Sequence, residues 1–275
     1  MTPHIIPALI AASLALAVPS VAREIGPEGL DSLPVVDVVV LGEVHDNAAH
    51  HANQARAVAA IAPAALVFEM LLPDQIARLP ADRSDADAME RALEWEARGW
   101  PDFGMYHPIF TAAPKARIYA GDLPRSVVQM ATRDGAAAAF GADAATFGLT
   151  TPYPADVQAA RESDLWAAHC FAMPKGTMAG MVEAQRLRDA AMADAALRAM
   201  DETGGPVVVI TGAEHARRDI GVPALLMQAR PALTVLSVGQ VEGVPDARPP
   251  FDLWIVTAGV ADRGDPCTAF GATDG

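Results

Sequence analysis

Two short segments of the sequence share one pattern, in which a glycine closes an apolar run and a histidine follows three residues later. The first segment is 42–45, which ends at His45, and the second is 212–215, which ends at His215. Glu43 lies inside the first segment, and Glu69 closes a third apolar run. Imidazole and carboxylate groups are ordinary ligands of divalent zinc, manganese or iron, and they also serve in general acid–base catalysis. The residue types therefore indicate either a metal-binding site or a centre of proton transfer.

The position of these residues after apolar runs predicts that they meet at one edge of a sheet. Parallel strands share a carboxyl edge, and ligands of parallel α/β proteins bind just beyond it. A residue three positions past a strand stays within loop reach of the neighbouring strand end, because consecutive Cα atoms are about 3.8 Å apart. We therefore expect the side chains of His45 and His215 to lie within about 8 Å of each other, with at least one of Glu43 and Glu69 beside them. Small adjustments on binding can close that distance around a shared ligand.

Three more residues in the first half of the chain have side chains suited to a cofactor. Tyr106 and His107 are both candidate axial ligands of haem, since tyrosine phenolate and histidine imidazole bind ferric iron. Aromatic packing within a loop is the alternative for this stretch, residues 100–109. His50 is a further candidate, because an expected helix places it on the same face as Gln54, four residues later.

Two candidates lie in the second half. Arg217 can clamp an anionic group, either a haem propionate or a substrate carboxylate, and the alternative is plain surface charge beside Asp219. Gln185 lies with Asp189 on an expected helix that is rich in methionine. These two polar residues either support the histidine site from behind or form a solvated helix edge.

Six short apolar runs predict strands at residues 35–41, 65–69, 116–121, 206–211, 233–238 and 251–256. Several are apolar almost throughout, as expected of strands covered on both faces. Helices are expected at 48–61, 155–171 and 177–200. The alternation predicts an α/β fold with a mainly parallel central sheet flanked by helices. Residues of about 124–205 contain no convincing strand, so we expect a smaller helical subdomain inserted into a single domain of residues 23–275.

The first 22 residues have the order of a secretory signal peptide. Residues 1–18 contain no Asp, Glu, Lys or Arg, and small residues at Ser20 and Ala22 then offer a cleavage site. The apolar part is shorter than the about 20 residues of a membrane-spanning helix, so no transmembrane anchor is expected. A buried N-terminal helix is the alternative. We expect a mature protein that begins near Arg23 and is periplasmic or secreted.

Composition excludes several function classes. A hydrophobic content of 52% with 20% charged residues is typical of a globular chain, and the net charge of −14 argues against a nucleic-acid partner. Cys170 and Cys267 lack CxxC spacing, which excludes a zinc ribbon, and the sequence leaves open whether they pair. The GxSxG, HExxH, GxxxxGK and GxGxxG motifs are absent from the sequence, which removes the simplest hydrolase and nucleotide-binding functions.

Taken in order along the chain, these residues resemble the ChaN-like family of haem-binding uptake proteins, within a wider Tiki/TraB-related superfamily that has paired GxxH motifs. The resemblance extends from about Val36 to Leu226. The residues that carry it are 41–47, His50, His51 and Gln54; 67–70; Trp100 and 106–108; 121–125; Gln185, Arg188, Asp189, Met192 and Ala193; 212–215; and 221–223.

The resemblance implies a parallel sheet with a helical subdomain, haem as the cofactor, and bacterial iron acquisition through a face-to-face homodimer. Two departures are visible: the lipoprotein cysteine of some members is absent, and Glu214 lies beside His215, where a small or neutral residue is expected. The first hypothesis is therefore an exported haem-binding protein. The second is a metal-dependent hydrolase of the protease or esterase kind, which would hold a divalent metal ion with His45, His215, Glu43 and Glu69 and use the two glutamates in catalysis.

Overall fold

The computed structural model describes residues 22–245, 247–261, 263–265 and 267–268. The expected signal peptide, apart from Ala22, lies outside the described residues. Seven strands form one sheet in the order β1-β7-β6-β2-β5-β3-β4, and all pairings between the described strands are parallel. The strands are β1 (Arg23–Glu24), β2 (Val38–Glu43), β3 (Ala65–Phe68), β4 (Arg117–Ala120), β5 (Val207–Gly212), β6 (Val235–Glu242) and β7 (Leu253–Thr257). The α/β class with a parallel central sheet is confirmed.

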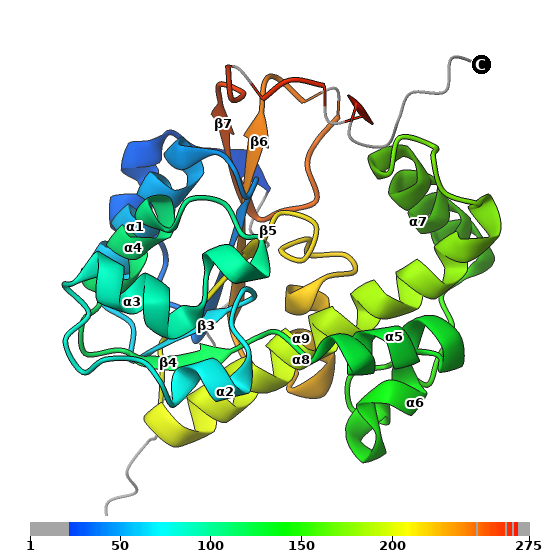
Figure 1. Ribbon diagram of the computed structural model, residues 1–275, viewed down its shortest axis with the longest axis horizontal. Helices are drawn as coiled ribbons and strands as arrows, with labels where there is room; N and C mark the ends of the chain where they lie inside the picture. The colour runs from blue at the N-terminus through cyan, green and yellow to red at the C-terminus, as the bar shows by residue number, and fades with distance from the viewer. Residues whose placement is uncertain (1–21, 246, 262, 266, 269–275) are drawn as a thin grey trace, which may run out of the picture.

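The helices lie on both faces of the sheet and in a group beside it (Figure 1). The α-helices are α1 (Ala48–Ile61), α2 (Pro73–Ile76), α3 (Ala86–Leu93), α4 (Phe103–Ala112), α5 (Arg125–Asp134), α6 (Ala136–Phe140), α7 (Ala155–Ala168), α8 (Met178–Thr203) and α9 (Val222–Ala229). Short 3-10 helices occupy η1 (Pro27–Ser32), η2 (Glu96–Arg98), η3 (Ala142–Ala145) and η4 (Lys175–Thr177). This arrangement covers the sheet on both sides, as the apolar strands require.

Alternate residues of the central strands pack into two separate cores. In β2, Val38 and Val40 belong to a core that includes residues of α8 and α9. Val39 and Leu41 belong to the opposite core, which includes residues of α1, α3 and α4. All four side chains are almost completely buried. Because both faces are covered, the strand has no polar alternation, and this explains why an apolar run predicts it.

Residues 125–203 form helices and no strand, as the sequence predicts. The long helix α8 packs on β3, β4 and β5, and it also contacts α5, α6 and α7. In Figure 1, α7 stands apart from the sheet and is joined to the rest through α8. Its only fully buried side chain is that of Arg161. The helical group therefore contacts the sheet mainly through α8.

Several local predictions were wrong. No helix was predicted at residues 100–109, for which a loop was the alternative, but most of these residues lie in α4. The Asp102 side chain accepts a hydrogen bond from the backbone N–H of Gly104 and caps this helix. Pro108 lies inside this helix, and because proline usually interrupts helices, the sequence did not predict a helix here. No helix was predicted at residues 136–145, which contain α6 and η3. The strand β6 also extends to Glu242, beyond the expected end at residue 238.

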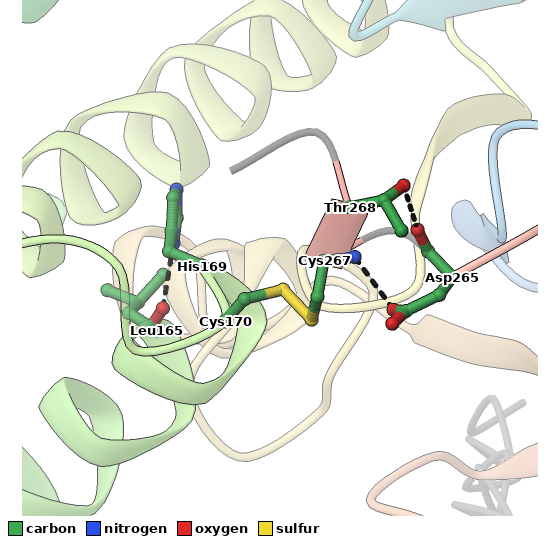
Figure 2. Close-up of a disulfide and its surroundings, with 6 residues drawn as sticks. All are labelled: Leu165, His169, Cys170, Asp265, Cys267 and Thr268. Carbon is green, nitrogen blue, oxygen red and sulfur yellow. Dashed lines mark hydrogen bonds between the residues drawn. A yellow bond between two sulfur atoms is a disulfide. The ribbon is translucent and has the colours of Figure 1, made fainter. Parts of the chain in front are cut away.

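The two cysteines form a disulfide between the end of the α7 region and the C-terminal segment. Cys170 and Cys267 are 97 residues apart in sequence, and their Cα atoms are 5.4 Å apart (Figure 2). Arg263, in the same C-terminal segment, pairs with both Asp46 and Glu242. The segment after β7 is therefore attached both to the sheet edge near His45 and to the helical group.

Candidate functional site

The two glycine–histidine segments meet at the carboxyl edge of three adjacent strands. β5 lies between β2 and β3, with Gly42 paired to Thr211 and Phe68 paired to Ile210. The Nε2 atoms of His45 and His215 lie 3.9 Å and 3.5 Å from the same oxygen, Oε1 of Glu69. The predicted convergence of the two histidines with a carboxylate is confirmed. Its cause is the sheet order, which brings the ends of three strands side by side.

Each glycine of the paired segments makes room for the other segment. A Cβ atom on Gly42 would lie 2.8 Å from the Cβ of Ala216 and 3.0 Å from the Cα of Ala213. A Cβ atom on Gly212 would lie 3.0 Å from Nε2 of His45. Gly42 therefore allows the backbone of the second segment to pack closely, and Gly212 leaves space for the imidazole of the first.

His45 is held by a buried carboxylate from its own segment. Its Nδ1 atom lies 2.8 Å from Oε1 of Glu43, which also accepts a hydrogen bond of 2.8 Å from the hydroxyl of Tyr106. The other oxygen of Glu43 lies 3.2 Å from Nδ1 of His51, whose Nε2 donates to the backbone carbonyl of His45. With Nδ1 engaged, the Nε2 atom of His45 faces the edge, and the side chain is 34% exposed.

His215 is held in the same way by a carboxylate from a different element. Its Nδ1 atom lies 2.7 Å from Oδ1 of Asp189, which α8 supplies. The His215 side chain is 9% exposed, much less than that of His45. Hydrogen bonding of Nδ1 to a carboxylate fixes the ring orientation and raises the basicity of Nε2 as a ligand atom. Both histidines therefore present Nε2 to the same place, and His45 is the more accessible.

Glu69 is fixed between them. Its Oε2 atom accepts hydrogen bonds of 2.7 Å from the Thr211 hydroxyl and from the backbone N–H of Gly212. Its Oε1 atom faces the two imidazoles. Burial alone would raise the pKa of Glu69, but the charges of His215 and His45 lower it. Glu69 is therefore an ionised carboxylate at the centre of the site.

The electrostatics keep His45 protonated in the ligand-free protein. Burial alone would lower the pKa of His45, but the hydrogen bond with Glu43 and the charge of Glu69 raise it to about 9. Burial would likewise raise the pKa of Glu43, but its bonds with His45 and His51 lower it to about 2. The pKa of His215 is also raised, against burial, by the charges of Glu69 and Asp189. A ligand that binds Nε2 of His45 near neutral pH must therefore displace a proton.

Two of the predicted cofactor-binding residues lie in the interior. The His50 side chain is fully buried, accepts a hydrogen bond from the backbone N–H of Val44 and contacts the Thr257 hydroxyl at 2.7 Å. Burial lowers its pKa to about 4, so it is a neutral structural residue. Tyr106 is fully buried, and burial and the charge of Glu43 raise its pKa. In this structure neither residue is accessible to a haem iron, and Tyr106 instead supports Glu43.

Of the three remaining candidates, His107 and Arg217 make contacts away from the edge. His107 reaches the backbone carbonyl of Arg83 at 2.8 Å, because it lies on another face of α4 than Tyr106. Arg217 binds Asp219 through two nitrogens, so its charge is already neutralised. The Oε1 atom of Gln185 is buried and has no hydrogen-bond partner among the described residues.

Glu214, the unexpected neighbour of His215, points away from the site. Its carboxylate pairs with Arg161 of α7 at 2.8 Å and lies 3.5 Å from Arg217. The side chain is 65% exposed. Glu214 therefore joins α7 to the sheet edge and contributes no ligand atom beside Nε2 of His215.

Two residues at the edge, Trp100 and Arg188, were named from the sequence only as carriers of the family resemblance and were not predicted to be part of the site. The ring of Trp100 is 5.1 Å from the ring of His45, centroid to centroid, and forms an aromatic wall beside it. Arg188 lies with Nη1 4.0 Å from Oε1 of Glu69. Its position next to Asp189 in the sequence was a signal that could have found it, but only once Asp189 is known to hold His215.

Within the described parts of the chain, no group of three or more His, Cys, Asp or Glu side chains is arranged to hold a metal ion. A divalent metal ion as the cofactor is therefore not supported by this part of the chain. A search of the same residues for helices long and apolar enough to cross a membrane finds none.

The protein is thus an α/β protein with a parallel sheet, and its candidate site consists of two histidines that carboxylates hold at the carboxyl edge of that sheet. The chain belongs to the family of haem-binding uptake proteins of the Tiki superfamily, ChaN, whose model matches residues 22–226. A search of curated proteins gives no match.

Two solved structures are similar to the chain. The first, titled "Cofacial heme binding to ChaN of Campylobacter jejuni", has a TM-score of 0.61 and 20% sequence identity, and the match covers 82% of this chain and 87% of that one. The second is the type III effector HopBA1, with a TM-score of 0.46, 13% identity and coverage of 85% and 94%. At this identity the first match shows a shared fold.

Proposed function

We propose that the protein is an exported haem-binding protein of bacterial haem and iron uptake. The observation that carries the proposal is the pair of imidazoles whose Nδ1 atoms are held by Glu43 and Asp189 while both Nε2 atoms face one edge. Neutral imidazole is an ordinary axial ligand of haem iron. Membership of a haem-binding family supports haem as the ligand.

The exposed fractions of the two side chains indicate which histidine binds the iron. His45 is 34% exposed and has the Trp100 ring beside it, whereas His215 is 9% exposed. An aromatic ring beside the ligand atom suits a porphyrin, which is flat and largely apolar. We therefore assign Nε2 of His45 as the axial ligand and place His215 and Glu69 in the polar floor of the same site.

Export is the second part of the proposal. Disulfides form and persist in oxidising compartments such as the periplasm and are rare in the cytosol. The bond between Cys170 and Cys267 therefore supports a location outside the cytoplasm. The expected leader, residues 1–22, makes the same prediction, so mass spectrometry of the mature protein should find an N-terminus near Arg23. A mature protein that retains residues 1–22 would contradict export through this leader.

A face-to-face dimer is the third part. The similar ChaN structure is described as binding haem cofacially, which places two haem groups face to face in that protein. Because His45 lies at an open edge, two copies can bring their edges together around their ligands. We expect haemin to convert monomer to dimer in analytical ultracentrifugation, and a protein that stays monomeric when saturated with haemin would remove the dimer from the proposal.

Titration with haemin, followed at the Soret band, tests haem binding. The wild-type protein should give a saturable shift, and His45→Ala should weaken binding by at least about tenfold, because the axial ligand is lost. His215→Ala should weaken it less. His107→Ala is the matched control, since His107 is a half-buried histidine whose imidazole reaches Arg83 instead of the edge. Absence of saturable binding in the wild-type protein, or equal losses in all three variants, would refute the proposed site.

A further inference from the structure

Arg188 has an unusual position among the charged residues around the site. It lies on α8, one residue before Asp189, and its side chain is 32% exposed. Its nearest carboxylate is Glu69, with 4.0 Å between Nη1 and Oε1. That distance is too long for a hydrogen bond. Within the described part of the chain, the guanidinium group of Arg188 makes no hydrogen bond, and its donors remain available.

The other arginines near the site already have partners. Arg161 binds Glu214 at 2.8 Å, and Arg217 binds Asp219 through two nitrogens. Arg263 binds the carboxylates of both Asp46 and Glu242. Each of these arginines already has a carboxylate within hydrogen-bond distance. Arg188 therefore differs from its neighbours in having unused donors at the edge itself.

Glu69 does not neutralise the charge of Arg188. One carboxylate oxygen of Glu69 is taken by Thr211 and Gly212, and the other faces His45 and His215. The two imidazoles also have carboxylate partners of their own, Glu43 and Asp189. The hydrogen-bond donors of Arg188 thus remain unused on the open side of the site, which favours a ligand with its own anionic group.

We propose that Arg188 binds a carboxylate of the ligand, which rests on the proposed function because the carboxylates of haem are its two propionates. The planar fork of a guanidinium matches a carboxylate through two parallel hydrogen bonds. Arg188 shares the oxygen of Glu69 with both histidines, so a ligand held at Nε2 of His45 lies within reach of it. This assignment replaces Arg217, whose donors are occupied.

Two ligands that differ only in their carboxylates test the assignment. Wild-type protein and Arg188→Gln are titrated with haemin and with haemin dimethyl ester, in which both propionates are methylated. For haemin, Arg188→Gln should weaken binding by about tenfold or more, the effect of losing a charge-assisted pair. For the diester, the same substitution should change affinity by less than about twofold. Arg188→Lys keeps the charge but loses the planar guanidinium, so its affinity for haemin should lie between those of the wild-type protein and Arg188→Gln.

Arg217→Gln is the matched control and should leave both affinities unchanged. If Arg188→Gln weakens binding of both ligands equally, or if wild-type protein binds haemin and its diester with equal affinity, Arg188 does not bind a carboxylate, and haem binding at His45 stands. If wild-type protein binds neither ligand saturably, the proposed function fails and the assignment of Arg188 fails with it.

Discussion

The two histidines of the site are held by the same kind of bond but by different parts of the molecule. His45 bonds to Glu43, two residues earlier, and this pair is backed by His51 of α1 and Tyr106 of α4. His215 bonds to Asp189, which lies 26 residues earlier on α8. The first histidine therefore depends on one strand end and the helices on one face of the sheet. The second depends on the inserted helical region and its packing on the opposite face.

This difference implies that substitutions in the two halves of the site have different effects on stability. The carboxylate of Glu43 is fully buried and faces three partners, so its loss disturbs the interior as well as the ligand atom. The carboxylate of Asp189 faces one histidine. Loss of the carboxylate on the His45 side should therefore cost more stability than loss of the carboxylate on the His215 side.

The largest expected effect is the loss of stability in Glu43→Gln. Removing the charge leaves the fully buried His51 without its ionic partner, and breaking a buried charged pair costs about 3 kcal/mol or more. In Asp189→Asn, His215 still faces the carboxylate of Glu69, and the amide oxygen can accept its hydrogen bond, so the cost should be about 1 kcal/mol. Urea unfolding of the two variants measures the difference. Equal losses of stability would show that the two carboxylates are not as different as their surroundings indicate.

Substitution of the two glycines by alanine should affect stability and haemin binding differently. In Gly42→Ala the new methyl group meets the Cα of Ala213 and the Cβ of Ala216, and this overpacking should cost about 1–3 kcal/mol. In Gly212→Ala it meets the far end of the His45 side chain, which can move. That variant should be more stable than Gly42→Ala but bind haemin more weakly, as urea unfolding and Soret titration would show. If Gly212→Ala binds haemin like the wild type, His45 is not the ligand.

The third expected effect is a pH dependence of haemin binding that belongs to His45. Its pKa is raised from 6.5 to about 9, so its proton favours the ligand-free protein, and that contribution is lost as pH rises through about 9. Because a ligand at Nε2 displaces this proton, haemin affinity should rise by up to about tenfold per pH unit between about pH 6 and about pH 8. His45→Ala should have a flatter profile. A rise of the same steepness in His45→Ala would assign the proton to another group.

Much of the fold follows from the sequence, because the central strands are buried on both faces and therefore consist of apolar runs. The helix α1 was predicted with its observed bounds, since Asn47 caps it and its apolar spacing is helical. The helix α4 was missed, because Pro108 and the preceding Trp-Pro-Asp sequence are typical of a loop. The two-residue strand β1 carries too little sequence for a pattern.

The site was predictable where it depends on strand ends and unpredictable where it depends on helix rotation. His45, His215 and Glu69 each follow a strand within three residues, so the parallel sheet alone brings them together. His50 and Tyr106 lie on helices, and a rotation of about 100° per residue decides whether such a side chain faces the edge or the core. The sequence does not determine that rotation, and both side chains are buried.

The most direct test of the account is the position of the iron in crystals of the protein grown with haemin. An anomalous difference map at the iron edge should place one iron atom per chain within coordination distance of Nε2 of His45, with Trp100 beside the porphyrin. Iron bound elsewhere, for example beside His107 or in a position reached only by displacing Tyr106, with Nε2 of His45 left without a ligand, would contradict the account.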